Sequence, residues 1–310
     1  MRILITGGTG LLGQTLVDEL ATKGHQVTIL SRDPRQFQDA MPEVELVRWD
    51  GRTTKGWGHL IETSDAVINL AGASISGEGF GKIIAQRWND ESKQRIRQSR
   101  LDVGLALVQA IEAAEKKPRI LVQASAVGYY GPRDNDDVSE DSPPGGDFLA
   151  QVCVDWENST APVEAMGVRR AIIRTGLVLT AEGGILPTML LPFRLFVGGP
   201  LGSGRQNVPW IHIQDEVQAI IYLLENDGVQ GAYNLSAPNP VTYKQFGKIA
   251  GKVMKRPSFF PVPSFALKLV LGEKSILVLD GQRAVPTRLL AAGYDFAYSD
   301  LEAALRDLLS

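Results

Sequence analysis

Three evenly spaced glycines directly follow the first apolar run of the chain. The run covers residues 2–6, and Gly7, Gly10 and Gly13 follow it as G-x-x-G-x-x-G. A helical pattern and a second apolar run come next, within 11–31. In such a unit the first glycine permits a sharp turn, the second lets a pyrophosphate approach the backbone, and the third lets the helix pack closely on the strand. The segment therefore predicts half of a dinucleotide-binding fold.

The end of the second predicted strand indicates which dinucleotide binds. An NAD site usually has an acidic residue here that bonds the ribose 2′-OH, but this chain has Ser31 and Arg32. A guanidinium can hold a 2′-phosphate through two charge-assisted bonds, whereas a carboxylate would repel it. We therefore predict NADP(H), with Ser31 and Arg32 on the 2′-phosphate. Arg35 is either a second phosphate ligand or a solvated loop residue.

Predicted strands and helices alternate over the first half of the chain, and the residue composition and pattern then change. The alternation predicts an α/β, Rossmann-type, doubly wound parallel sheet. Residues 180–209 are rich in Gly and Pro, and the chain beyond 241 is mostly helical. We predict an NADP-binding domain formed by 1–175 and 210–236. A small, mostly helical C-terminal lid domain would consist of 176–209 and 237–310.

Ligands of an α/β sheet bind beyond the carboxyl ends of its strands. Small residues follow the predicted strand at 66–70, where a ribose and pyrophosphate can lie on the backbone. Asp50 either approaches the adenine or is a turn residue. The residues predicted to bind the cofactor are Gly7, Thr9, Gly10, Leu11, Leu12, Gly13, Ser31, Arg32, Asp50, Leu70, Ala71, Gly72, Ala73 and Ala124.

Composition excludes several classes of partner and site. The net charge of the 310 residues is −3, without a basic block, so we expect no nucleic-acid partner. No apolar run is long enough to span a membrane, so we expect no membrane partner. Cys153 is the single cysteine, which fits a cytoplasmic or equivalent reducing compartment, such as an organelle stroma after removal of a transit peptide. No Cys/His set has metal-ligand spacing, so no metal site is expected.

The motifs together resemble the extended short-chain dehydrogenase/reductase superfamily, the group of NAD-dependent epimerases and dehydratases. More narrowly, the chain resembles an atypical branch called "epimerase family protein", some members of which are labelled cell-division inhibitors. The resemblance covers essentially the whole chain. It is carried by TGGTGLLG at 6–13, NLAGA at 69–73, SAVGYYG at 125–131, RTGLVL at 174–179, PWIHIQDE at 209–216 and GGPLGSG at 198–204.

The resemblance implies a catalytic tyrosine with a lysine four residues later, and this pair is missing. In the superfamily the lysine lowers the pKa of the phenol, so that it exchanges protons near neutral pH. The sequence pattern predicts a helix from Phe148 to about Met166. No tyrosine of this chain has lysine at +4, and the part of this helix from Phe148 to Glu157, where the pair should lie, contains neither residue. Ser125 remains as the residue that would hold a substrate oxygen.

Tyr129 and Tyr130, just past Ser125, are the candidates for a rearranged acid/base. Arg133 stands four residues after Tyr129 as a cationic neighbour. Glu140 and Cys153 are further candidates, although a buried, inert role is the commoner one for a single cysteine.

Three functions are compatible with this departure. The first is an NADP(H)-dependent oxidoreductase with Ser125, Tyr129 and Tyr130 as catalytic residues and an unknown small carbonyl or alcohol as substrate. The second is a non-catalytic NADP(H)-dependent sensor that acts on a protein partner. The third is a nucleotide-sugar epimerase or dehydratase, which we disfavour because its chemistry needs the same missing proton shuttle.

Several charged and aromatic residues are candidates for the substrate cleft. Lys93, Arg97 and Arg100 lie on a long predicted helix over 82–115, where a solvated role is the alternative. His212 is expected to be a hydrogen-bonded structural residue rather than a catalytic one. The residues predicted to bind substrate are Arg194, Arg205 and Trp210. Asn207 would complete the same wall of the cleft.

Overall fold

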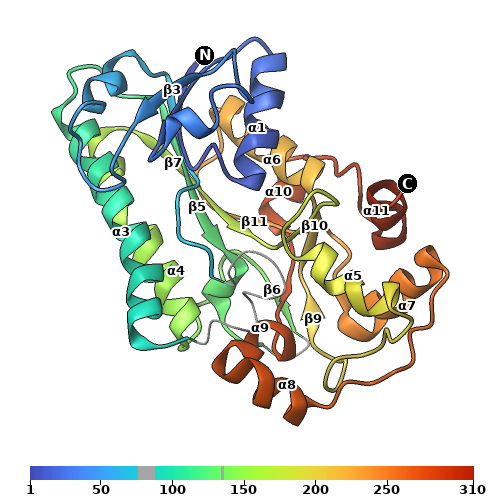
Figure 1. The fold of residues 1–310 in the computed structure, drawn as a ribbon. Coiled ribbons are helices and arrows are strands. Elements are labelled where there is room, and N and C mark those ends of the chain that lie inside the picture. The colour runs from blue at the N-terminus through green and yellow to red at the C-terminus, as the bar shows by residue number, and fades with distance from the viewer. Residues whose placement is uncertain (76–87, 134–135) are drawn as a thin grey trace.

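The computed structural model describes residues 1–75, 88–133 and 136–310, and its main element is a seven-stranded parallel sheet (Figure 1). The strand order reverses between β1 and β4, which is the switch point at which open α/β sheets bind ligands. The predicted Rossmann-type, doubly wound fold is therefore confirmed. In spatial order the strands are β11 (Gly231–Leu235), β7 (Arg169–Thr175), β5 (Ile120–Ala126), β4 (Ala66–Asn69), β1 (Arg2–Thr6), β2 (Gln26–Ser31) and β3 (Glu45–Arg48).

Helices cover both faces of the sheet. On one face α1 (Leu11–Thr22) and α6 (Ile213–Glu225) pack over Ile3 and Ile5. On the other, α3 (Asp90–Ala113) packs over Leu4, and α4 (Phe148–Ser159) lies beside α3 (Figure 1). The odd and even residues of β1 thus enter two different cores, as strand geometry requires.

Local chemistry sets the ends of the two helices that flank the site. Asn89 and Ser92 form a capping box that starts α3 at Asp90, so residues 88–89 of the predicted helix are not helical. The part of that prediction over 82–87 lies outside the described residues. Asp147 caps α4 by accepting from two backbone N–H groups. α4 ends at Ser159, before the predicted end at 166, and the chain continues as a 3-10 turn that contains Pro162.

The smaller part of the molecule has a hydrophobic core of its own. Phe193, Trp210 and Phe246 are fully buried in it. Its short strands pair locally, β8 with β10 and β9 with β12, rather than joining the main sheet. Its elements are β8 (Leu177–Leu179), α5 (Leu186–Arg194), β9 (Asn207–Val208), β10 (Trp210–His212), β12 (Val241–Thr242), α7 (Tyr243–Met254), α8 (Ser264–Leu271), α9 (Ile276–Leu279) and α11 (Leu301–Leu308).

The last part of the chain returns to the main sheet. β13 (Arg283–Ala284) pairs with β6 (Asp137–Val138), and α10 (Thr287–Ala291) packs on β11. Leu289 and Phe296 enter the core of the main sheet. The predicted division at 237 stays a prediction, and these two residues show that the segment 237–310 serves both cores.

Candidate active site

The glycine turn lies against the backbone that follows β4. Gly7 has a φ of +75°, and a Cβ there would lie 2.7 Å from the carbonyl carbon of Leu70. A Cβ on Gly13 would lie 2.4 Å from the Gly7 oxygen. Gly10 is the N-cap of α1 and has no side chain, so no capping side chain occupies the first N–H groups of the helix. This geometry fits a pyrophosphate at the start of α1.

A buried polar chain aligns the ends of the three central strands. The hydroxyl of Thr6 donates to Asn69 Oδ1 at 2.6 Å, and Asn69 Nδ2 donates to Gln123 Oε1 at 2.9 Å. All three side chains are fully buried. These hydrogen bonds link β1, β4 and β5 where the predicted cofactor residues leave the sheet.

The predicted 2′-phosphate residues lie at the end of β2. Ser31 is buried, and its hydroxyl accepts from the Asp33 N–H at 3.3 Å, whereas Arg32 is exposed. Asp50 accepts from the backbone N–H of Thr53 and of Arg52 and from the Thr53 hydroxyl. These bonds lower the pKa of the Asp50 carboxyl. Its position thus matches the turn residue that was the alternative to adenine contact.

The small-residue segment 71–73 is held by α3. The Ala73 N–H donates to the Ser99 hydroxyl at 3.0 Å, and Arg100 Nη1 donates to the Ala73 oxygen at 3.2 Å. Arg100 is buried and stacks over the Trp156 ring, and burial lowers its pKa to about 10. Arg100 therefore positions the backbone on which a ribose would lie.

The other two cations proposed for the cleft form ion pairs. Lys93 pairs with Glu273, and Arg97 pairs with Asp155. Both pairs have at least one partner whose side chain is about half exposed, so they join elements at the surface and are worth little energy. Lys93 and Arg97 thus take the surface role that was the alternative to a cleft, and Arg100 is buried as a clamp on the backbone.

Ser125, at the end of β5, belongs to a buried ionic network. Its hydroxyl donates to Glu157 Oε1 at 2.7 Å. Glu157 also accepts two bonds from Arg174, at 2.9 and 3.0 Å. All three side chains are at least nine-tenths buried. The bidentate pair holds the carboxylate in one orientation, and the carboxylate in turn directs the Ser125 proton.

The two candidate tyrosines have different environments. Tyr130 is fully buried, donates to Asn234 Oδ1 at 2.6 Å and accepts from Arg174 Nη1 at 3.0 Å. Burial raises its pKa to about 12, despite the nearby Arg174 charge. Tyr129 is half-buried, and its ring lies 3.5 Å from the Arg174 guanidinium carbon. Tyr130 therefore has the geometry of a structural residue, and Tyr129 is the more accessible of the two.

Arg174, not Arg133, is the cation beside Tyr129. Arg133 instead donates to the carbonyls of Tyr130 and Pro143, which ties the following loop together. Glu140 is equally structural: its Oε1 accepts from the backbone N–H of Asn234 at 3.0 Å. Arg133 thus does not have the partner that its +4 spacing suggested, because long-range contacts, not spacing along the chain, decide the cation beside Tyr129.

Cys153 lies beside Ser125, on the α4 face that also carries Glu157. Its thiol is within hydrogen-bond reach of the Ser125 hydroxyl and the Ala126 backbone. Burial, followed by the charge of Glu157, raises its pKa to about 11, so the thiol is protonated near neutral pH. Cys153 and Glu157 have the i,i+4 spacing expected of the absent tyrosine and lysine. That spacing was a signal in the sequence that pointed to Glu157.

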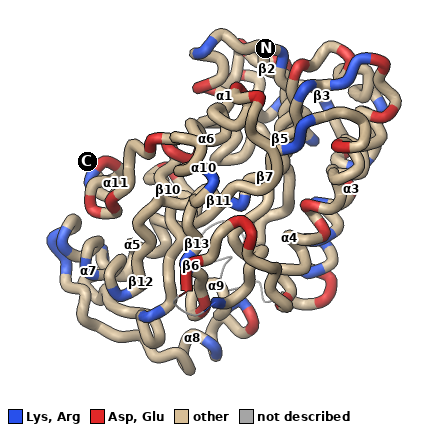
Figure 2. Tube along the Cα trace, turned by 180° about the vertical axis from the view of Figure 1, so that it is seen from behind, with Lys and Arg blue, Asp and Glu red and all other residues tan. Residues whose placement is uncertain are grey.

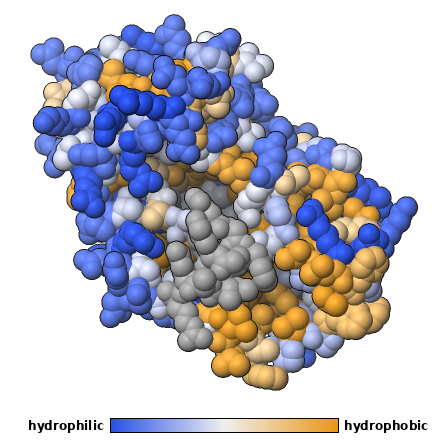
Figure 3. Space-filling model, in the orientation of Figure 1, coloured by the Kyte–Doolittle hydropathy of each residue, from blue (hydrophilic) through white to orange (hydrophobic). Residues whose placement is uncertain are grey.

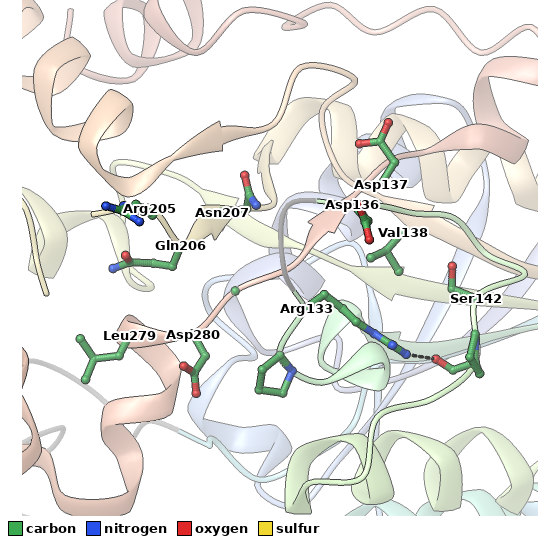
Figure 4. Close-up of a pocket in the computed structure, with 13 residues that line it drawn as sticks. Arg133, Asp136, Asp137, Val138, Ser142, Arg205, Gln206, Asn207, Leu279 and Asp280 are labelled. Carbon is green, nitrogen blue, oxygen red and sulfur yellow. Dashed lines mark hydrogen bonds between the residues drawn. The ribbon is translucent and has the colours of Figure 1, made fainter. Parts of the chain in front are cut away.

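A cavity of about 680 Å³ lies between the loop after Tyr130 and the smaller part of the molecule. In Figure 4, Arg205, Gln206 and Asn207 face Arg133 and Ser142 across it. The predicted residues Arg205 and Asn207 thus line one wall, and the charged lining residues are Arg133, Asp136, Asp137, Arg205 and Asp280.

The remaining predicted substrate residues are elsewhere. Trp210 is fully buried in the core of the smaller part, with its Nε1 donating to the Asn239 oxygen, so it supports the fold and cannot present its ring to a substrate. Arg194 ends α5 as an exposed side chain and does not line the cavity. His212 is buried and stacked on Tyr298, which agrees with its expected structural role. Among residues 1–75, 88–133 and 136–310, no cluster of metal-ligating side chains is found.

The chain matches known families along most of its length. Residues 3–236 match the NAD dependent epimerase/dehydratase family, and 262–308 match a domain of unknown function, DUF1731. The chain is 42% identical to the epimerase family protein YfhF of Bacillus subtilis (strain 168), over 100% of this chain and 98% of that protein. It is 39% identical to the chloroplastic SDR39U1 homolog of Arabidopsis thaliana, covering 100% of this chain and 87% of the relative.

Solved structures support the same relationship. The human epimerase family protein SDR39U1, whose crystal structure contains NADPH, is 35% identical and superposes with a TM-score of 0.87, covering 99% of each chain. The UDP-glucose 4-epimerase of Thermus thermophilus, in complex with NAD, has a TM-score of 0.76 at 18% identity, covering 100% of this chain and 98% of the other. At that identity the second likeness concerns the fold alone.

Proposed function

Because the chain belongs to the NAD-dependent epimerase/dehydratase family, in its branch of epimerase family proteins, we propose that it binds NADP(H) and is an oxidoreductase for a small carbonyl or alcohol. One observation carries the proposal: the glycine turn packs on the backbone at 70–71, beside the end of β2, and Arg32 rather than a carboxylate follows that strand. The NADPH in the related human structure supports the same cofactor.

The residues at the strand ends would each bind a different part of the cofactor. The start of α1, at Gly10, would hold the pyrophosphate through backbone N–H groups. Arg32 would hold the 2′-phosphate, and the segment 71–73, clamped by Ser99 and Arg100, would support the ribose. When bound, the nicotinamide donates or accepts a hydride at its C4.

Ser125 would orient the substrate oxygen. Its proton is directed toward Glu157, so its oxygen keeps lone pairs that can accept from a substrate hydroxyl. In the reductive direction the carbonyl carbon gains the hydride and the oxygen needs a proton. Tyr129 and the protonated thiol of Cys153 are the two candidate donors. Of these two, Tyr129 is the half-buried one, to which solvent would return the proton, whereas Cys153 is buried.

Mixing experiments can test the oxidoreductase. The purified chain is titrated with NADPH, and the complex is mixed with a panel of small carbonyl compounds and quinones while the nicotinamide absorbance is followed. We expect oxidation by at least one compound. Three single variants test the site: Ser125→Ala, Tyr129→Phe and Cys153→Ala. We expect Ser125→Ala and one of the other two to slow turnover by about 10²- to 10⁴-fold. Tyr222→Phe, on the far end of α6, is the matched control. If all three site variants turn over like the parent, the catalytic assignment is wrong.

A non-catalytic NADP(H)-dependent regulator is the second candidate. It is favoured by the engagement of the Ser125 and Tyr130 hydroxyls with protein groups. Tight NADPH binding without oxidation by any panel member would rank this function above the enzyme. The next measurement would then be NADPH-dependent capture of a protein partner. An epimerase or dehydratase acting on a sugar nucleotide ranks third, because it also needs a proton shuttle.

A further inference from the structure

The smaller part of the molecule exposes large apolar side chains in segments 195–197 and 259–260 and at Phe265, at the start of α8. Phe259 is 70% exposed and Phe265 is 74% exposed. The segments 195–197 and 259–260 lie side by side, because the Phe260 N–H donates to the Gly198 oxygen at 3.1 Å. Figure 3 shows hydrophobic side chains gathered on this side of the molecule, toward α5, α7 and α8. We define the apolar patch as Leu195, Phe196, Val197, Phe259, Phe260 and Phe265.

The backbone at this patch is strained. Among the described residues, the non-glycine residues with positive φ are Phe196, at +63°, and Lys255, at +55°. Glycine adopts this conformation without a steric penalty, and for a bulky side chain it is an outlier. The chain therefore keeps a phenylalanine, 55% exposed, at a position that the backbone would favour for glycine. Strained residues of this kind are held in place by the surrounding structure, and they cluster at functional sites.

The surroundings of the apolar patch are basic. Residues 183–214 and 241–272 together contain eight of the 32 Lys and Arg residues and none of the 35 Asp and Glu residues. Figure 2 shows this cluster of positive charge along α7. Lys252 pairs with Glu302 of α11, whereas Lys255 and Arg256 are exposed beside the apolar patch, with Arg256 4.3 Å from the Phe196 ring. The net charge of −3 hides this asymmetry.

We propose that the apolar patch and its basic surroundings dock on an anionic lipid surface. Exposed phenylalanine and leucine beside lysine and arginine is the chemistry of proteins that bind the membrane interface. Each cation near an anionic leaflet adds attraction, and the apolar side chains enter the boundary between headgroups and acyl chains. Among the described residues no helix is long and apolar enough to cross a membrane, so the contact would be peripheral. The proposal departs from the expectation of no membrane partner, because that expectation considered only membrane-spanning segments.

Charge argues against a second copy of the chain as the occupant. In a two-fold symmetric dimer the same patch would face itself. The basic side chains around Phe196 and Phe259 would then oppose each other without acidic partners from 183–214 or 241–272. Like charges brought together at an interface are unfavourable, whereas an anionic bilayer complements them.

Vesicle co-sedimentation of the full chain tests this proposal. We expect binding to vesicles of phosphatidylglycerol and phosphatidylcholine, little binding to phosphatidylcholine alone, and loss of binding at high salt. Phe196→Gly is the sharpest variant, because it removes a patch side chain and also relieves the strained backbone. It should lower vesicle affinity about tenfold while thermal stability is unchanged or higher. Leu105→Ser, at an exposed leucine of α3, is the matched control and should bind like the parent.

Two double variants that remove positive charges measure the electrostatic part of vesicle binding. Lys255→Gln with Arg256→Gln should weaken binding about fivefold per charge removed, whereas Lys23→Gln with Lys116→Gln, in the main-sheet part, should not. Failure to bind phosphatidylglycerol vesicles, equal binding to neutral vesicles, or parent-like binding by Phe196→Gly would each overturn the proposal. So would self-association in sedimentation velocity that Phe259→Ser abolishes, since this result would identify a second copy as the occupant.

Discussion

The Ser125 hydroxyl donates a 2.7 Å hydrogen bond to Glu157, a carboxylate whose two oxygens are both held by Arg174. This relationship joins β5, α4 and β7 at the edge where the cofactor is proposed to bind. It also gives Ser125 a fixed rotamer before any substrate arrives.

Glu157→Gln should strongly destabilise the fold. Removing one charge of a buried pair leaves Arg174 uncompensated, which typically costs about 3–5 kcal/mol. Urea unfolding followed by circular dichroism measures the loss. Asp155→Asn, on the same helix but in a surface pair with Arg97, is the control and should cost less than about 1 kcal/mol. Equal losses for the two variants would mean that the buried network contributes little.

Tyr130→Phe and Tyr129→Phe should differ in stability. The Tyr130 hydroxyl is buried between Asn234 and Arg174, so its removal leaves buried polar groups unsatisfied and should cost about 1–3 kcal/mol. The Tyr129 hydroxyl makes no hydrogen bond to any described residue, and its loss should cost less than about 0.5 kcal/mol. Thermal unfolding of both variants checks the order, and a reversed order would contradict it.

Arg32→Asp should change cofactor preference. The variant loses the charge-assisted bonds to a 2′-phosphate and adds repulsion, so NADPH affinity should fall about 10- to 100-fold while NADH affinity changes little. Fluorescence titration with both dinucleotides measures this. Arg35→Asp in the same assay shows whether Arg35 is a second ligand, and Lys116→Asp controls for charge alone. Similar losses for NADPH and NADH in Arg32→Asp would refute the 2′-phosphate assignment.

The buried carboxyl of Glu216 should make stability depend on pH. Burial raises its pKa to about 8, although the Thr175 hydroxyl donates to it at 2.7 Å. The native state therefore keeps a proton that the unfolded chain releases above about pH 4.5. The contribution of this group to stability is full below that pH, falls as pH rises, and is lost by about pH 8.

Glu216→Gln isolates this effect. Glutamine keeps the acceptor for Thr175 and does not ionise, so the variant should lack the decline between pH 5 and 8. Between pH 5 and pH 8, the free energy of unfolding of the variant should rise by on the order of 2–4 kcal/mol relative to that of the parent. Urea unfolding at both pH values measures the difference. A parent and variant with parallel pH profiles would exclude Glu216 as the source.

Cys153 should be slow to react in the native protein. The thiol is buried and its pKa is raised to about 11, so little thiolate exists at pH 7.5. As the single cysteine of the chain, it gives an unambiguous signal with a chromogenic disulfide reagent. We expect modification at least about 100-fold slower in buffer than in denaturing urea. Comparable rates would show that the α4 edge opens readily.

Local patterns in the sequence were enough to predict the dinucleotide half-fold. The spacing of Gly7, Gly10 and Gly13 between a strand and a helix predicts a dinucleotide-binding turn, because residues close in the sequence set the space that is available to each glycine. Arg32 could be placed at the end of β2 for the same reason. The helix end at Ser159 was missed, although Pro162 three residues later was a local signal that the helix does not continue.

The sequence by itself determined the doubly wound parallel sheet, the glycine turn and the missing tyrosine–lysine pair, because these depend on short-range pattern and on residue type. Only the tertiary structure decided that Glu157 and Arg174 meet Ser125, that Trp210 is core, and that Arg100 clamps the 71–73 backbone. It also brought 195–197 beside 259–260, so that apolar and basic residues form one surface. Contacts between residues distant in the chain depend on how all the elements pack, which no local window of sequence contains.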